Sequence, residues 1–193
     1  MTDVHSVCVF CGASPGTNPA YMAAADAFGR ALARAGMRLI YGGGRVGMMG
    51  AVADGALAEG GTVIGIIPEF LRRLEVAHDG VAEMVITDSM HTRKRRMFDL
   101  ADAFVSLPGG LGTFDETIEI ITWRQLRLHD KPILLCDIAG AFGPLVATIE
   151  AAIAQGFARS EARSLFEVVQ GVDATIERVR HLATARGGAS SLL

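Results

Sequence analysis

One glycine-rich turn most constrains how this chain folds. Residues 108–113 read Pro-Gly-Gly-Leu-Gly-Thr, after the apolar run 103–107 and before a helical pattern from Thr117 to Leu128. The turn therefore joins a buried strand to a helix. Three glycines in four residues permit left-handed dihedrals and let a ligand approach the backbone. Free N–H groups and the positive end of the helix dipole make such a turn a natural seat for a phosphate or carboxylate.

Glu116 lies one turn inside that helix and has two interpretations. Its carboxylate is close enough to face whatever the turn holds. Thr113 and Glu116 also have the S/T-x-x-E spacing of a capping box, in which Glu116 bonds back to the Thr113 N–H and does no chemistry. The spacing alone does not decide between them.

Strand patterns alternate with helical patterns along the whole chain, without repeats or a linker. The expected strands cover 4–10, 37–41, 62–67, 83–87, 103–107, 133–137 and 166–170. This alternation predicts one α/β domain over residues 1–185, a Rossmann-like, doubly wound, mostly parallel sheet with its site above the carboxyl edge. The last helix is expected over 172–184, followed by a frayed tail over 186–193.

Composition excludes several classes of protein. Half of the 193 residues are hydrophobic and the mean hydropathy is +0.34, which indicates a sheet buried on both faces and a subunit interface. The net charge of -3 offers no positive field for nucleic acid. No apolar run reaches the roughly 18 residues of a membrane span, and the N-terminus lacks a basic leader, so we expect a cytoplasmic protein without a membrane partner.

The cysteines give no sign of a metal centre. Cys8 and Cys11 form a C-x-x-C pair, but they fall in and at the end of a predicted strand, where residues three apart point to opposite faces. The five histidines are scattered. We therefore expect buried structural thiols and no metal site.

A second glycine turn offers a nicotinamide alternative. Gly42, Gly44 and Gly47 satisfy G-x-G-x-x-G, and the next strand ends at Glu69, where a ribose-binding acid would be sought. However, the motif follows the second strand, and the turn at 109–112 competes for the phosphate role.

Four consecutive basic residues, 93–96, lie in the helical pattern that precedes the central motif. Such a run is usually a solvated face. Because each helical residue steps about 100°, however, one or two of the four must turn toward the sheet. Arg93 or Lys94 beside the glycine turn would add positive charge to an anion-seeking site.

Two stretches together resemble the paired signatures of the LOG (Lonely Guy) family, M-H-x-R-K-x-x-M and P-G-G-x-G-T-x-x-E. They are Met90–Met97 and Pro108–Glu116, and the likeness also includes Cys11–Ser14 and His129–Pro132. The resemblance implies a cytokinin riboside 5'-monophosphate phosphoribohydrolase, whose bacterial relatives also hydrolyse AMP. It also implies a homodimer and a Rossmann-like sheet.

The same resemblance implies the site residues. The catalytic pair falls on Arg93 and Glu116. Nucleotide contacts fall on Glu75, Lys94, Gly110, Leu111, Gly112, Thr113, Phe114, Asp115 and Thr122, with Ser14, Gly43 and Gly44 as possible additional contacts. Two positions depart from the family pattern, since Asp115 stands where many relatives have Glu and Arg127 where many have Gly.

Hydrolysis of an N-glycosidic bond passes through an oxocarbenium-like ribose, which a carboxylate near C1' stabilises. This chemistry implies no cofactor and a small nucleotide substrate. Family members have often been labelled lysine decarboxylases, but a pyridoxal enzyme needs a Schiff-base lysine, and only Lys94 and Lys131 are present. A non-enzymatic nucleotide or molybdenum-cofactor carrier on the same fold is the main alternative, because it needs the glycine turn but not both Arg93 and Glu116.

Overall fold

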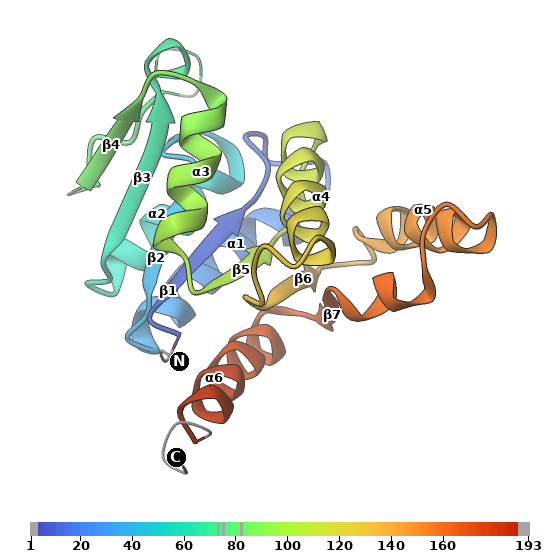
Figure 1. Cartoon of the computed structure of the whole chain (residues 1–193). Helices are drawn as coiled ribbons and strands as arrows, with labels where there is room; N and C mark the ends of the chain where they lie inside the picture. The colour runs from blue at the N-terminus through green and yellow to red at the C-terminus, as the bar shows by residue number, and fades with distance from the viewer. Residues whose placement is uncertain (1–3, 73, 75, 82, 189–193) are drawn as a thin grey trace.

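The structure, a computed structural model, describes residues 4–188 except 73, 75 and 82. Seven parallel strands form one sheet in the order β4-β3-β2-β1-β5-β6-β7 (Figure 1). The strands are β1 Ser6–Phe10, β2 Arg38–Tyr41, β3 Val63–Pro68, β4 Glu83–Thr87, β5 Ala103–Ser106, β6 Ile133–Asp137 and β7 Glu167–Gln170. The helices are α1 Pro19–Arg34, α2 Gly47–Ala58, α3 Met90–Leu100, α4 Leu111–Gln125, α5 Gly143–Ala154 and α6 Val172–Gly188, with short 3₁₀ turns η1 Glu69–Leu71 and η2 Ser160–Ser164. The predicted α/β fold is confirmed.

The strand order reverses at β1. The chain moves outward through β2, β3 and β4 on one side, then returns to pair β5 with the other side of β1. In open α/β sheets, ligands bind beyond the carboxyl ends of the strands at such a switch point. The glycine turn that follows β5 and the turn that follows β1 meet there, since the Gly12 N–H donates to the Pro108 carbonyl at 3.1 Å.

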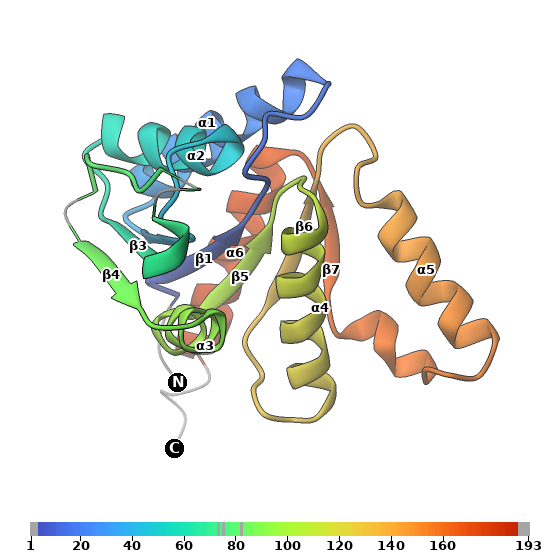
Figure 2. The ribbon, with the colours of Figure 1, turned by 90° about the horizontal axis from the view of Figure 1, so that it is seen from above.

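The inner strands β1, β2, β3, β5 and β6 are almost entirely buried, as the high hydropathy predicted, whereas the edge strands β4 and β7 are largely exposed or half-buried. Helices α1, α2 and α6 cover one face, with Phe28, Leu32 and Val52 in its core. Helices α3 and α4 cover the other, with Met97 and Ile120 (Figure 2). Because the inner strands are buried on both sides, their sequences are nearly continuous apolar runs, which is the pattern of parallel strands.

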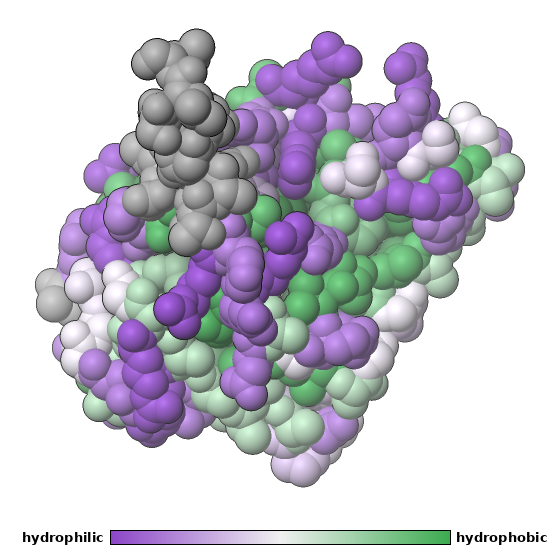
Figure 3. Space-filling view, turned by 90° about the horizontal axis from the view of Figure 1, so that it is seen from below, coloured by the Kyte–Doolittle hydropathy of each residue, from purple (hydrophilic) through white to green (hydrophobic). Residues whose placement is uncertain are grey.

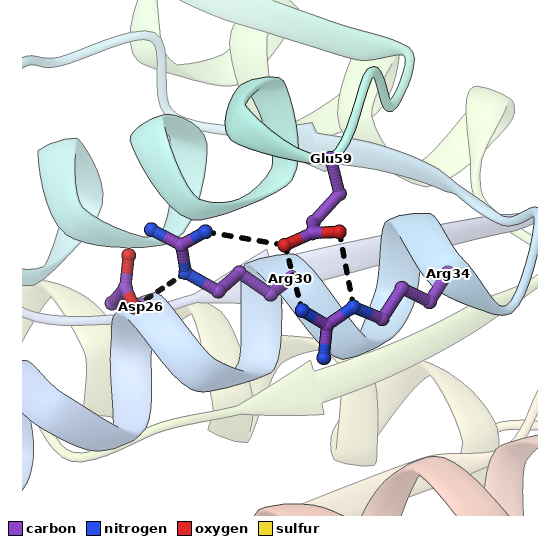
Figure 4. Close-up of polar contacts among 4 residues, drawn as sticks. All are labelled: Asp26, Arg30, Arg34 and Glu59. Atoms are coloured by element: carbon purple, nitrogen blue, oxygen red, sulfur yellow. Dashed lines mark hydrogen bonds and ion pairs between the residues drawn. The ribbon is translucent and has the colours of Figure 1, made fainter.

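A charged network ties α1 to α2 at the surface (Figure 4). Glu59, the residue after α2, accepts hydrogen bonds from Arg34 Nη2 at 2.7 Å and Arg30 Nη1 at 3.2 Å. Arg30 also donates from Nε to Asp26 at 2.8 Å. The two arginines therefore share one carboxylate across the helix pair.

Helix α5 stands apart from the sheet and packs against η2 (Figures 1 and 2). None of its twelve residues is buried, although its sequence GPLVATIEAAIA is largely apolar. An apolar helix whose apolar face is only half-buried leaves hydrophobic surface for a partner to cover.

The helix boundaries correct two predictions. Helix α4 begins at Leu111 with Gly110 as its N-cap, six residues before the predicted start at Thr117. Thr113 is therefore inside the helix and the capping-box interpretation is wrong. Helix α6 runs to Gly188, beyond the predicted end at Thr184, and residues 189–193 lie outside the described part of the chain.

Candidate active site

A cavity of about 620 Å³ opens at the carboxyl ends of β1 and β5. Most of the predicted site residues line it. They are Ser14, Arg93, Gly110, Gly112, Thr113, Phe114, Asp115 and Glu116. The turn after β1, helix α3 and the start of α4 thus contribute to one hollow at the switch point of the sheet.

The start of α4 forms the floor that an anion would occupy. No side chain caps this helix, and its first main-chain bond runs from the Phe114 N–H to the Gly110 carbonyl at 3.1 Å. The N–H groups of Leu111, Gly112 and Thr113 precede that bond, so the helix itself does not satisfy them. Together with the helix dipole, they favour a phosphate or carboxylate.

Gly109 allows this turn to lie close to the first strand. A Cβ at residue 109 would overlap the Thr113 side chain and come within 2.8 Å of the Gly12 nitrogen. Thr117, one turn further along α4, donates to the Thr113 carbonyl at 2.6 Å and shares a 2.7 Å hydrogen bond with Ser106 of β5. These buried hydroxyls fix the helix start against the sheet.

Arg93 is the member of the basic run that turns inward. Its side chain is buried, and Nε donates to the Ile66 carbonyl at 3.1 Å while Nη2 donates to the Gly42 carbonyl at 2.8 Å. Two carbonyls at the ends of β3 and β2 therefore hold the guanidinium at the cavity wall. A buried cation in this position is suited to orienting a carboxylate or a substrate.

Glu116 lies on the same cavity wall and is half-buried. Its electrostatic effect reaches the first strand. Burial, and after it the Glu116 charge, raises the pKa of both Cys8 and Cys11, whereas Arg93 lowers the pKa of Cys8. The carboxylate and the guanidinium therefore both lie near the carboxyl end of β1, as the interpretation of these two residues requires.

Other predicted contacts lie elsewhere. Lys94 lines a separate small hollow between α3 and α4, and the exposed Thr122 donates to the Ile118 carbonyl at 2.8 Å, outside the cavity lining. Leu111 is 88% exposed. Gly43 and Gly44 are buried and are not among the lining residues, and Glu75 lies outside the described residues.

The predictions missed most of the apolar wall. Tyr21, Met48, Met49, Leu71, Met90, Ala141 and Phe142 line the cavity. The sequence feature that these residues share is their position after the carboxyl end of a strand or at the start of the next helix, and this position could have marked them as cavity residues. Such a wall suits the faces of a flat, apolar group such as a purine.

The fold and the cavity define an α/β protein whose switch point holds a cavity suited to a small anionic ligand. A family model described as "Possible lysine decarboxylase" matches residues 49–179. A cytokinin riboside 5'-monophosphate phosphoribohydrolase from Rhodococcoides fascians is 45% identical over 176 residues, covering 91% of this chain and 89% of the relative. The same-named LOG2 of Arabidopsis thaliana is 41% identical over 159 residues, covering 82% and 75%. The chain therefore belongs to the LOG family, as its two motifs predicted.

A solved structure shares the fold at lower identity. A molybdenum-cofactor (Moco) carrier protein from Chlamydomonas reinhardtii superposes with a TM-score of 0.69 at 22% identity, covering 93% of this chain and 98% of that one. This likeness concerns the fold alone.

The described residues lack two further features. They contain no group of three or more histidine, cysteine or acidic side chains placed to hold a metal ion. None of their helices combines the length and apolar character of a bilayer span.

Proposed function

We propose that this protein hydrolyses the N-glycosidic bond of a purine riboside 5'-monophosphate, with adenine or an N6-modified adenine as the base. The products are the free base and ribose 5-phosphate. One observation carries the proposal. Arg93 and Glu116 share a cavity with the uncapped start of α4, so a cation and a carboxylate lie near backbone N–H groups that would suit a phosphate.

The 5'-phosphate binds at the start of α4. The N–H groups of Gly112 and Thr113 and the dipole of a fifteen-residue helix attract it. Binding energy gained at this remote group positions the ribose for reaction. The base then lies against the apolar wall formed by Met48, Met49 and Phe142.

Glu116 acts on the ribose. Water attacks C1' as the bond to the purine nitrogen breaks, and the proton that water loses balances the one that the departing base gains. Positive charge develops on the sugar during this step, and the Glu116 carboxylate stabilises it and orients the water. Arg93 orients Glu116 or the substrate from its fixed seat on the carbonyls of Ile66 and Gly42.

We also propose that the protein is a homodimer. Two observations support it: the apolar helix α5 has no fully buried residue, and Ile118, Phe157 and Val168 are 39%, 85% and 38% exposed. Figure 3 shows hydrophobic residues gathered on the side of the molecule where Figure 1 places β7 and α5. A second copy would cover this apolar surface. We also propose a cytoplasmic location, because all three cysteines are free thiols, the state that a reducing compartment maintains.

The test is to incubate the protein with AMP and with an N6-prenylated AMP and to assay free base and ribose 5-phosphate. Stoichiometric appearance of both products supports the proposal. Binding without turnover would instead identify a nucleotide or molybdenum-cofactor carrier.

A further inference from the structure

The partners of Lys94 are two carboxylates of the protein, not the atoms of a bound nucleotide. Its Nζ lies 2.6 Å from Asp115 Oδ2 and 3.3 Å from Glu119 Oε2, and its side chain is 18% exposed. Both carboxylates belong to α4, whereas Lys94 belongs to α3. The ammonium therefore bridges the two helices that carry Arg93 and Glu116.

The two partners of Lys94 flank Glu116 along α4. Asp115 is the residue before it, and Glu119 is three residues after it, on the same side of the helix. Glu116 and Glu119 also line the small hollow that contains Lys94, beside the ring of Trp123. Glu116 thus borders the main cavity on one side and the Lys94 hollow on the other.

The charges around Glu116 come close to balance only when Lys94 is present. Among the described residues, the neighbouring elements supply two cations, Arg93 and Lys94, against Asp115, Glu116 and Glu119. Strand β1 and the residue after it supply the neutral thiols of Cys8 and Cys11. Three carboxylates within two turns of one helix repel one another and favour proton uptake. A cation between two of them removes most of that repulsion.

The protonation state of Lys94 agrees with this arrangement. Burial by itself lowers the pKa of Lys94, but the hydrogen bonds and charges of Asp115 and Glu119 outweigh it and raise the pKa above its ordinary value. Lys94 therefore stays charged throughout the pH range in which the carboxylates titrate.

We propose that Lys94 is a positioning residue which neutralises Asp115 and Glu119, so that Glu116 remains ionised and aimed at the ribose. This inference rests on the proposed hydrolase function. It replaces the nucleotide contact that the family resemblance implied for Lys94, because the ammonium lies in the side hollow with two carboxylate partners.

The decisive variant is Lys94→Met, which keeps the unbranched stem and removes the charge. In this variant the acid limb of the kcat–pH profile should shift to higher pH by about one unit relative to the parent, because loss of the cation favours the protonated form of Glu116. Activity should fall about tenfold on that limb and approach the parent value above it. Lys94→Arg, which keeps the charge, should leave the limb within a few tenths of a unit.

A compensating variant separates charge balance from simple loss of packing. In Lys94→Met combined with Asp115→Asn and Glu119→Gln, the repelling carboxylates are gone and the limb should return to the parent position. A Lys94→Met variant with a raised KM, an unchanged limb and no rescue by the triple variant would overturn the proposal and identify Lys94 as a nucleotide contact.

Two further measurements keep the inference testable. If Lys94→Met fails to fold, the Asp115→Asn, Glu119→Gln double variant should shift the limb downward, and an unchanged limb would overturn the proposal. If the parent shows no turnover, the proposed function fails. The Lys94 inference is then decided by ¹³C carboxyl NMR titration of Glu116 in the ligand-free parent and Lys94→Met proteins, where an identical titration midpoint would refute it.

Discussion

The guanidinium of Arg93 and the backbone of Gly42 occupy one small space at the end of β2. Arg93 Nη2 donates to the Gly42 carbonyl at 2.8 Å, and a Cβ at residue 42 would overlap that same nitrogen. The residue must therefore be glycine for the arginine to reach its seat. Gly42, the first glycine of the alternative nicotinamide motif, thus holds the Arg93 guanidinium at the cavity.

Gly42→Ala should displace Arg93 without unfolding the protein. We expect kcat/KM to fall by about 10²-fold, because a catalytic group moved by a fraction of an ångström loses its alignment. Gly143→Ala is the matched control, since a Cβ there meets nothing within 4 Å. Its activity should equal that of the parent. Equal activity of Gly42→Ala and the parent would show that the seat of Arg93 is unimportant.

The phosphate seat is tested at Gly112. A Cβ at this position meets no protein atom within 4 Å, so Gly112→Ala should leave Tm unchanged or slightly raised. The added methyl group would nevertheless crowd a phosphate bound at the start of α4. We expect KM for AMP to rise about tenfold. The measurement is steady-state kinetics beside a thermal melt, and an unchanged KM would place the phosphate elsewhere.

Arg127 closes α4 with a Schellman motif. The Arg127 N–H donates to the Arg124 carbonyl and the Leu128 N–H to the Trp123 carbonyl, both at 3.0 Å. Arg127 has φ 59°, a left-handed conformation that costs a residue with a Cβ about 1 kcal/mol. This strain is a physical reason to expect glycine at this position, as the family resemblance implies.

Arg127→Gly should therefore stabilise the protein, with Tm raised by about 2–4 °C. The same motif ends α1, α2 and α5, where glycine already occupies the position as Gly36, Gly60 and Gly156. Gly60→Arg is the matched reverse variant, because a Cβ there meets nothing within 4 Å, and its Tm should fall by a similar amount. Opposite signs in the two melts are the expected result. A Tm lowered by Arg127→Gly would contradict the claim that the left-handed conformation of Arg127 destabilises the folded protein.

The network around Glu59 should make stability depend on pH and salt (Figure 4). Hydrogen bonds from Arg34, and then from Arg30, lower the pKa of Glu59. Because the pKa of Glu59 is lower in the folded protein, these hydrogen bonds contribute their full stabilisation above the unfolded-state pKa, near 4.3. That stabilisation is lost as the pH falls through the folded-state pKa. Glu59→Gln should lower Tm by about 1–2 °C at pH 7 and low salt. The difference should shrink in 1 M salt and below pH 3, and a difference that persists there would have another cause.

The order of strands and helices was predictable because the strands are continuous apolar runs. All residues of β3, for example, are buried, so its sequence is a short apolar run that stands out between the helical patterns on either side. The start of α4 was not predictable in the same way. Gly110, Leu111 and Gly112 carry no helical periodicity, and glycine disfavours helix, so the glycine motif predicted the anion seat but not that the helix begins within it.

The candidate site was predictable from its motifs but not from periodicity alone. The four basic residues of α3 gave equal grounds for Arg93 and Lys94 to face the sheet. Packing of Met97 into the core fixes the rotation of the helix, which brings Arg93 to the cavity and Lys94 to the side hollow. Phe142 and Tyr21 could not be assigned, because their approach to the cavity depends on how distant elements pack.

The most direct test of Glu116-dependent hydrolysis is Glu116→Gln, assayed with AMP for turnover and, by calorimetry, for nucleotide binding. Hydrolysis should fall by at least about 10³-fold while Kd for AMP changes by less than about threefold, since an amide neither stabilises the oxocarbenium-like sugar nor disturbs the phosphate seat. Turnover at the parent rate in a properly folded Glu116→Gln protein would contradict that dependence.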